Sequence, residues 1–411
     1  MSSESAQFSF AIVARADLPP PALRFTGFPK YNFVGGHNDP DSLPAADLTA
    51  AAVAVMSREA RDLAMYGMTS GPQGYLPLRH FLVKKLKKDA GITCTVDDLL
   101  ITSGSLQGID LVNAMLVAPG DTVIIEEDNY GGTFTKLERA RAVSVAIPLD
   151  RDGMRIDALA NVLADLKAKG VRPKYINTVP TVQNPTGTVM PVERRHEMIR
   201  LARTYGVPIF EDDCYADLVF DRQRPPAIYG LSDWPGVIHI GSFSKSVAPA
   251  LRIGFVVAPW EAMSRLLALK TDAGTPAIEQ MVLAEFCEKR FDAHVESLNK
   301  ALSAKARTMM EALNEQFGTA AEFESPRGGI FLWVTLPEGV DTMRLFEVAA
   351  KCGIALNPGV EWSRAAQRNR RQMRLCFANP SQQAIRDGVA ALAEVCRTEF
   401  GIPKQIANVQ R

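Results

Sequence analysis

A repeated alternation of apolar strands and amphipathic helices occupies the middle of the chain, from residue 99 to residue 259. Apolar runs of strand length occur at residues 99–102, 122–126, 144–149, 174–179, 207–212, 237–240 and 253–258. Helical patterns separate the first five of these runs, at residues 105–117, from 132 onward, at 156–169 and at 192–205. Continuous apolar strands separated by amphipathic helices predict a mainly parallel sheet covered on both faces, and therefore an α/β fold.

The chain has 411 residues, which is more than one hydrophobic core usually serves. We expect a large domain at residues 45–277 and a smaller C-terminal domain at residues 278–411. The smaller domain is expected to be α+β, with elements at residues 278–317, 329–336, 343–352, 372–377 and from 383 onward. Residues 1–44 show no sustained period and are expected to form an N-terminal arm that packs onto something else.

Charge and cysteine usage exclude several classes of partner. With 46 basic and 46 acidic residues, the chain is not expected to bind nucleic acid or a membrane surface. No apolar stretch is long enough to span a bilayer, and residues 1–7 lack the pattern of a secretory signal. Six scattered cysteines indicate free thiols in the cytoplasm, and five histidines without ligand spacing predict no metal site.

Lys245 is the residue that most strongly indicates a function. It directly follows Gly-Ser-Phe-Ser after the apolar run at 237–240, and Arg252 opens the next apolar run. Apolar surroundings lower the pKa of an amine, while nearby hydroxyls and a guanidinium can hold a phosphate. Pyridoxal 5'-phosphate (PLP) requires such a lysine for a Schiff base, together with an acidic partner for its ring nitrogen.

The acidic partner is predicted at the end of the run at residues 207–212, where Glu211, Asp212 and Asp213 follow one another. In an open α/β sheet the carboxyl ends of the strands face the ligand crevice, so Asp212 is expected to point towards the crevice that holds Lys245. A carboxylate paired with the pyridine nitrogen keeps that nitrogen protonated. The ring then accepts electrons from a carbanion at the substrate α-carbon.

The chain resembles the class I and II aminotransferases, which are PLP enzymes of the aspartate-aminotransferase fold (fold type I). The motifs that carry this resemblance are Asn184-Pro185-Thr186-Gly187, Asp212-x-x-Tyr215, Ser242-Phe243-Ser244-Lys245 and Arg252. A finer resemblance, to the kynurenine and α-aminoadipate aminotransferases, is carried by Gly35-Gly36, Tyr66, Glu211-Asp212-Asp213-x-Tyr215 and Met373-Arg374-Leu375. The resemblance implies fold type I, with a large PLP-binding domain and a smaller C-terminal domain.

The resemblance also implies roles for single residues. The phosphate of PLP is expected on Gly104, Ser105, the Leu106 amide, Ser242, Ser244 and Arg252. A helix that opens at Ser105 directly after a strand would present free N–H groups to that phosphate. Tyr130 is expected to stack on the pyridine ring, and Asn184 and Tyr215 to bind its phenolic oxygen, so that Tyr215 joins Lys245 and Asp212 as a catalytic residue.

Two positions depart from the pattern of many relatives. Leu106 stands where they have glutamine, so one side-chain contact to the cofactor is expected to be missing. Cys214 stands where they have proline, which leaves the geometry of that turn open.

Substrate binding is expected to depend on Arg374, which lies in the middle of the predicted strand at 372–377. A buried arginine needs an anion, and its planar fork suits the α-carboxylate of an amino acid. The alternative is a structural ion pair within the lobe. The resemblance adds Asn184 and Gly36 to the substrate site. It also implies that Tyr66 reaches the phosphate from a neighbouring subunit, which makes the protein a homodimer with shared active sites.

The predicted function is that of an enzyme, a PLP-dependent aminotransferase that moves an amino group between an L-amino acid and a 2-oxo acid through a Lys245 Schiff base. Another PLP reaction, such as β-elimination or decarboxylation, would use the same residues and stays open. A PLP-binding regulator with a DNA-binding domain is a remote alternative, because only about 30 residues precede Gly35. The amino donor is not indicated, although residues 8–28 are expected to cover the side-chain pocket, where Arg15 or Arg24 could pair with a distal carboxylate.

Overall fold

The structure is a computed structural model that describes residues 9–15, 18–19, 21–22, 24–25, 27–365 and 368–403 of the chain. The expected arm and C-terminal domain both extend into residues outside this described part. Within it, no helix is both long enough and apolar enough to cross a membrane.

A seven-stranded sheet forms the centre of the larger lobe, in the order β2-β10-β9-β8-β7-β3-β4. Its strands are β2 (Leu99–Thr102), β3 (Thr122–Glu126), β4 (Val143–Ile147), β7 (Ile176–Thr178), β8 (Ile209–Asp212), β9 (Val237–Ser242) and β10 (Gly254–Val257). β10 runs antiparallel to both of its neighbours, and the other pairs are parallel. The mainly parallel sheet expected from the sequence is therefore confirmed.

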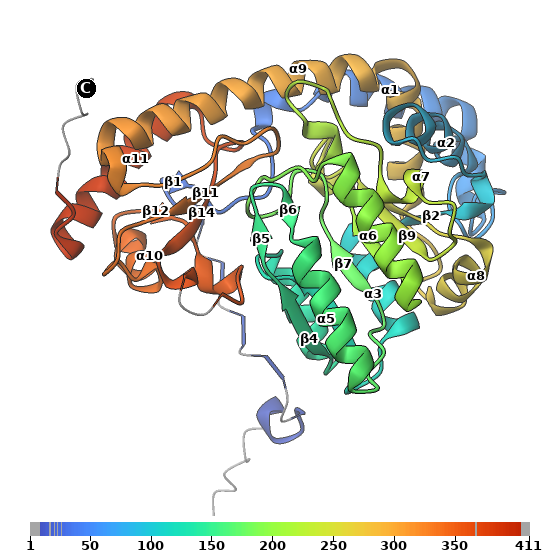
Figure 1. Cartoon of the computed structure of the whole chain (residues 1–411). Helices are drawn as coiled ribbons and strands as arrows, with labels where there is room; N and C mark the ends of the chain where they lie inside the picture. The colour runs from blue at the N-terminus through green and yellow to red at the C-terminus, as the bar shows by residue number, and fades with distance from the viewer. Residues whose placement is uncertain are drawn as a thin grey trace, which may run out of the picture.

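Helices cover both faces of this sheet (Figure 1). They are α2 (Leu76–Ala90), α3 (Ser105–Leu116), α4 (Gly131–Arg139), α5 (Ile156–Ala168), α6 (Val192–Tyr205), α7 (Ile228–Leu231) and α8 (Trp260–Leu269). Successive strand residues point to opposite faces. Ile124 of β3 accordingly packs in the core that includes α5 and α6, while Ile125 packs in the core that includes α3 and α4.

The smaller lobe is α+β, as expected. An antiparallel sheet of β11 (Phe331–Thr335), β14 (Gln372–Cys376) and β13 (Asn357–Pro358) lies with α10 (Thr342–Lys351) and α11 (Gln382–Phe400). β1 (Tyr31–Asn32) pairs with β12 (Ile354–Ala355), so the chain just before the larger lobe is attached to the smaller one. A short hairpin of β5 (Leu149–Asp150) and β6 (Gly153–Met154) follows β4.

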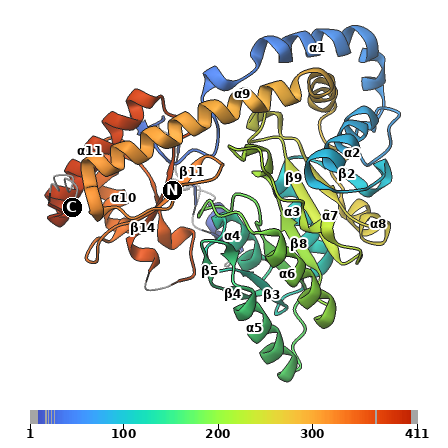
Figure 2. The ribbon, with the colours of Figure 1, turned by 45° about the horizontal axis from the view of Figure 1, so that its top comes forward.

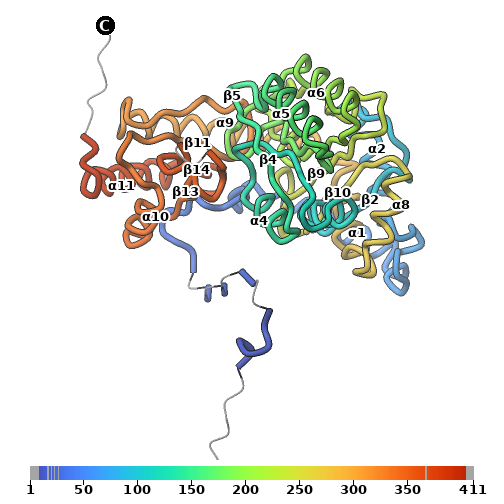
Figure 3. Tube along the Cα trace, turned by 60° about the horizontal axis from the view of Figure 1, so that its bottom comes forward, coloured from blue at the N-terminus to red at the C-terminus, as the bar shows by residue number. Residues whose placement is uncertain are grey.

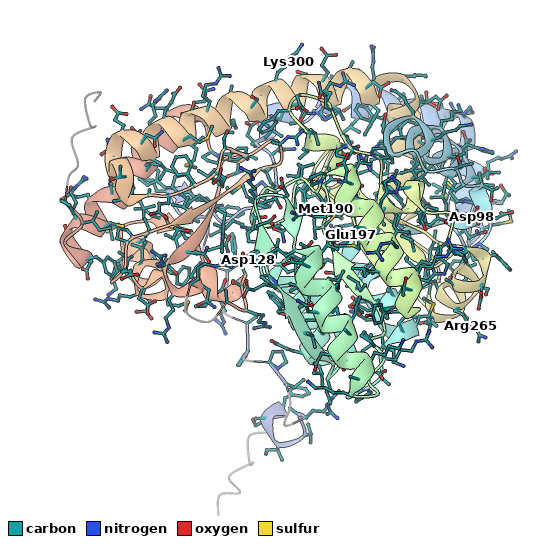
Figure 4. All side chains as sticks on the ribbon, in the orientation of Figure 1. Asp98, Asp128, Met190, Glu197, Arg265 and Lys300 are labelled. Carbon is teal, nitrogen blue, oxygen red and sulfur yellow. The ribbon has the colours of Figure 1, made fainter. Side chains whose placement is uncertain are left out.

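One helix, α9 (Ala277–Phe317), runs through both lobes over 41 residues (Figures 1 and 2). Its apolar side chains up to Val295 belong to a core of the larger lobe, and those from Leu298 onward belong to the core of the smaller lobe. Lys300, just past this changeover, projects from the outer side of the helix (Figure 4). The division of domains at residues 277/278 stays a prediction, because both lobes share this helix.

Residues 31–32 of the arm pair with β12, but its described stretch before Phe28 extends away from the rest of the chain (Figure 3). It contains a short 3-10 helix, Phe10–Ile12, and its aromatic side chains are exposed, with Phe10 at 79% and Phe25 at 77%. The helix α1 (Ala45–Glu59) follows the arm and packs along α9. The expectation that residues 8–28 cover a substrate pocket stays a prediction, because residues 8, 16, 17, 20, 23 and 26 lie outside the described part of the chain.

Candidate active site

A cavity of about 310 Å³ lies at the carboxyl ends of β8 and β9, where the two lobes face each other. Its walls include most of the residues predicted from the sequence, namely Gly36, Ser105, Leu106, Tyr130, Asn184, Asp212, Tyr215, Ser242, Ser244, Lys245, Arg252 and Arg374. Gly104 and Tyr66 are not among them, and Tyr66 is 91% exposed. Arg15 and Arg24 do not line the cavity either.

Lys245 follows the end of β9 and forms hydrogen bonds with two residues of the N-terminal arm. Its Nζ donates to the carbonyl oxygen of Gly36, and the side-chain amide of Asn38 donates to the Lys245 carbonyl oxygen at 2.8 Å. The Nζ atom lies 5.9 Å from the centroid of the Tyr215 ring. Burial lowers the pKa of this amine, because the charged form loses its hydration. The result is an amine that gives up its proton more readily than a surface lysine.

Asp212 ends β8 and has Ile240 of β9 as its partner in the parallel register. The next residue, Asp213, turns away from the cavity and forms an ion pair with Arg224, with Oδ2 and Nη2 2.5 Å apart. No cation among the described residues forms an ion pair with Asp212, and burial raises the pKa of this carboxyl group. Of the two adjacent carboxylates, only Asp212 therefore faces the cavity, which is the one that the strand-end argument selected.

A cradle suited to an anion lies at the start of α3. The helix begins without a side-chain cap, so its first N–H groups are free. Gly104 has a φ of +76°, and a Cβ there would collide with the guanidinium of Arg252. A Cβ at Gly254 would lie 2.6 Å from the Ser105 nitrogen, so both glycines are needed for this close approach. A helix N-terminus beside an arginine fits the phosphate of PLP.

Two hydroxyls complete the cradle. Ser242 ends β9, and its Oγ accepts a hydrogen bond from the Ser244 N–H at 3.1 Å. Both serines line the cavity together with Arg252, whose Nη2 donates to the Ser103 carbonyl oxygen at 3.2 Å. The donors at this end of the cavity therefore come from two loops that lie far apart in the sequence.

Arg374 is 4% exposed and bonds only to neutral groups. Its Nη1 donates to Asn184 Oδ1 at 3.1 Å, and its Nη2 donates to Asn357 Oδ1 at 2.7 Å and to the Val34 carbonyl oxygen at 3.1 Å. In the described part of the chain it forms no ion pair, so the alternative of a structural ion pair is not supported. Burial lowers the pKa of the guanidinium to about 10.

Two aromatic rings enclose this guanidinium. Its Cζ lies 3.8 Å from the centroid of Phe331 and 3.6 Å from that of Trp362. Stacking on both faces leaves only the edge of the planar group available to a ligand. Asn184 also donates to the Tyr215 hydroxyl at 3.3 Å, which joins the arginine to the lysine side of the cavity.

Sequence reasoning missed Asn357, Phe331 and Trp362. Trp362 is placed by a junction between the lobes, where Asp128 forms a bridge with Ser363 and the Asn129 N–H donates to the Trp362 carbonyl oxygen. Asp128 is labelled at this junction in Figure 4. The indole ring then lies 5.6 Å from the ring of Tyr130. A polar residue at 357 within an apolar stretch was the one signal that could have been noticed.

A buried group of Glu211, Asp213 and His239 lies next to the cavity. Glu211 accepts hydrogen bonds from the Ile228 N–H at 2.7 Å and from His239, and Asp213 pairs with Arg224. Protein donors therefore already bind Glu211 and one oxygen of Asp213, while Asp213 Oδ1 has no hydrogen-bond partner in the described part of the chain. The absence of a metal from the enzyme stays a prediction.

A family model for class I and II aminotransferases matches residues 36–392. The chain belongs to this family. The aminotransferase is 31% identical to aromatic-amino-acid aminotransferase 1 of Thermococcus litoralis, over 90% of this chain and 88% of that protein. It is 30% identical to the 2-aminoadipate transaminase of Thermus thermophilus, over 89% and 90% of the two chains. The solved kynurenine aminotransferase of Pyrococcus horikoshii, in complex with PMP, has a TM-score of 0.84 at 32% identity, covering 91% of this chain and 92% of that one.

These relatives confirm the family, the fold type, the transaminase activity and the PLP cofactor expected from the sequence. The aminotransferase also resembles a regulator with a helix-turn-helix domain, YdfD of Bacillus subtilis, at 32% identity over 78% of this chain. The matched region spans 65% of that protein.

Proposed function

We propose that this PLP-dependent aminotransferase binds its cofactor covalently through Lys245 and holds the α-carboxylate of an L-amino acid on Arg374. The observation that carries the proposal is the guanidinium of Arg374, which is buried, has only neutral partners and faces the same cavity as the Lys245 amine. An uncompensated buried cation of this kind favours an anionic ligand.

When bound, PLP supplies a carbonyl carbon that combines with amines and a ring that accepts electrons from the substrate α-carbon. With the cofactor bound, Asp212 would keep the ring nitrogen protonated, and Tyr130 would pack against the ring. The Lys245 amine, whose pKa is lowered by burial, would act as the base that takes the proton from the substrate α-carbon and as the acid that gives it back. Asn184 orients both Tyr215 and Arg374, because it bonds to each of them.

The amino donor is proposed from the relatives. They are described as acting on aromatic amino acids, on 2-aminoadipate and on kynurenine. We expect one of these L-amino acids, with 2-oxoglutarate or pyruvate as acceptor, to give the highest kcat/KM in a panel. Turnover should require both substrates. Keto-acid formation beyond one equivalent per active site without any acceptor would instead indicate a β-lyase, and release of carbon dioxide a decarboxylase.

A homodimer with shared active sites is also part of the proposal. Its support is the exposure of Tyr66, at 91%, on a segment that also exposes Met65 at 53% and follows the exposed Val53 of α1. Exposed apolar side chains in this stretch of the chain favour a contact between copies of the chain. A cytoplasmic location is proposed because the six cysteines are free.

Reduction with borohydride tests the central claim. A purified yellow holoenzyme treated with borohydride should retain its cofactor on Lys245, as mapped by peptide mass spectrometry. Lys245→Ala should bind PLP reversibly and lose turnover. Cofactor found on another lysine, or a colourless holoenzyme, would overturn the proposed role of Lys245.

A further inference from the structure

The start of α3 is fixed by a side chain that reaches back along the chain. Gln107 lies in the first turn of the helix, and its Oε1 accepts a hydrogen bond from the Ser103 N–H at 2.8 Å. The N-cap residue, Gly104, has no side chain to cap the helix. At the start of α11, by contrast, Ser381 Oγ accepts from the Ala384 N–H at 3.1 Å and so occupies a first-turn donor. Gln107 therefore fixes the start of α3 without occupying the first-turn N–H groups.

Ser103 is the residue through which this contact reaches the anion cradle. Its N–H is bound by Gln107, and its carbonyl oxygen accepts from Nη2 of Arg252 at 3.2 Å. The next residue, Gly104, is the one whose added Cβ would collide with the guanidinium of Arg252. A displacement of Ser103 would therefore move the arginine and the first N–H groups of α3 relative to each other.

Asp272, in the loop between α8 and α9, determines which way the Gln107 amide points. Gln107 Nε2 donates to Asp272 Oδ2 at 2.5 Å, while Asp272 Oδ1 accepts from Lys270 Nζ at 2.5 Å and from the Gly274 N–H at 3.1 Å. Although burial opposes the change, the hydrogen bonds from Lys270 and Gln107 lower the pKa of Asp272 to about 2. An ionised carboxylate can only accept, so the amide nitrogen of Gln107 faces Asp272 and its oxygen faces Ser103.

The loop that carries Asp272 is itself anchored. The side chain of Lys270 is only 3% exposed, and a buried ammonium group requires a partner such as this carboxylate. Thr275 Oγ1 donates to the carbonyl oxygen of Ile101 in β2 at 3.1 Å. Because β2 leads directly to Ser103, the loop and the start of α3 are held on the same strand.

We propose that Gln107 and Asp272 are positioning residues for the phosphate of PLP. Asp272 orients the Gln107 amide, and this amide holds Ser103 so that Arg252 and the free N–H groups of α3 meet at one place. Donors that are already in position need no ordering when the anion binds, which favours affinity. This inference rests on the proposed function, in which PLP occupies the cavity with its phosphate at the start of α3.

Two single variants and their combination test the two contacts. Gln107→Met keeps the length of the side chain without its amide, and Asp272→Asn keeps the size but can also donate, so it no longer fixes the amide direction. Gln383→Met is the matched control, because Gln383 lies in the first turn of α11 and donates to Asp387 at 2.9 Å, away from the cavity.

Each apo-protein is titrated with PLP and with pyridoxal, which lacks the phosphate. The thermal midpoint reports general damage to the fold. Hydrogen exchange of the peptide that contains the Ser103 amide reports the contact itself.

Gln107→Met and Asp272→Asn should each weaken PLP binding roughly five- to tenfold, the factor expected from losing one hydrogen bond. The affinity for pyridoxal should change little, because pyridoxal has no phosphate to place. The Ser103 amide should exchange faster in Gln107→Met. The double variant should bind PLP no more weakly than Gln107→Met, since the oriented contact is already lost. Gln383→Met should behave as the native protein in every measurement.

Native PLP affinity in Gln107→Met would overturn the inference. Equal losses for PLP and pyridoxal would also overturn it, because they would indicate a general loss of structure. Losses that add in the double variant would contradict the role of Asp272, because the two residues would then act independently.

Arg252→Ala distinguishes these outcomes from a failure of the proposed function. If this variant binds PLP and pyridoxal with the native ratio of affinities, the phosphate does not lie at the start of α3. If it selectively loses PLP while Gln107→Met does not, only the role of Gln107 is wrong.

Discussion

At the scale of single residues, Arg374 can select a substrate with a carboxylate because its own charge is not neutralised by the protein. Its donors are partly used by Asn184, Asn357 and a carbonyl oxygen, yet its charge has no counter-ion in the described chain. The aromatic rings on either side exclude water from its faces and leave an edge-on approach. A substrate carboxylate would supply the missing charge in the geometry that the fork requires.

Arg374→Ala should lower kcat/KM for amino acids. The corresponding loss of binding free energy should be roughly 2–5 kcal/mol, the range for truncating one member of a buried charge pair. This corresponds to roughly one and a half to more than three decades. Arg374→Lys should restore only part of the loss, because an ammonium cannot make a two-pronged contact. Steady-state kinetics with an amine that lacks a carboxylate provide the control, and its turnover should change little. Intact amino-acid kinetics in Arg374→Ala would place the carboxylate elsewhere.

At the scale of single elements, the ends of the parallel strands gather buried carboxylates. Glu126 ends β3 and is fully buried, where it accepts hydrogen bonds from Thr178 at 2.6 Å, from the Val179 N–H at 3.1 Å and from Gln183 at 3.0 Å. Burial raises its pKa to about 7. Gln183 precedes Asn184, so this carboxylate anchors the turn that carries a predicted substrate residue.

Glu126 should make the stability of the apo-protein depend on pH. Its folded pKa of about 7 lies above the ordinary glutamate value, so between roughly pH 4.3 and 7 the folded state binds more protons than the unfolded state. Stability from this group therefore falls as pH rises through that window. We expect the free energy of unfolding of Glu126→Gln, measured relative to the native protein by denaturant unfolding, to be higher at pH 8 than at pH 5. The increase should be on the order of a few kcal/mol.

Glu197→Gln, at a half-exposed position on α6 (Figure 4), is the matched control and should show no such gain. If the difference between Glu126→Gln and the native protein is the same at both pH values, Glu126 does not titrate in this window.

The start of α3 offers a second prediction at this scale. Gly104→Ala forces a side chain into a left-handed conformation and against Arg252, so the PLP affinity of the apo-protein should fall at least roughly tenfold. Gly120 has a similar φ of +88° but open space around it, so Gly120→Ala should introduce the same backbone strain without changing the affinity for PLP. Fluorescence titration with PLP measures both. Equal affinities in the two variants would exclude a role for this close approach.

For the whole molecule, the proposed dimer should depend on Tyr66 acting across subunits. Lys245→Ala and Tyr66→Ala chains should each be impaired alone. In a mixed dimer one site carries both changes and the other carries neither, so about half of the native activity should return for a two-fold assembly. Light scattering checks the assembly, and exchange is verified with differently tagged chains. Proven exchange without recovered activity would contradict a shared site.

Local pattern alone was enough to predict the parallel sheet, its strand ends and the meeting of Lys245, Asp212 and Arg252. Strand residues alternate between faces, and parallel strands end at one edge, so sequence order dictates which polar groups meet there. The prediction could not extend to Asn357, Phe331 and Trp362, because these residues come from the smaller lobe and reach the cavity only through lobe packing.

The tertiary structure alone decided which charged groups were left without a partner. Asp213 pairs with Arg224, while among the described residues Asp212 accepts a hydrogen bond only from the Cys214 N–H, although the two aspartates are adjacent and chemically alike. Arg374 likewise lies between two rings and not beside a carboxylate. Pairing of this kind depends on distances between segments far apart in the chain, and burial makes each unpaired charge costly enough to matter.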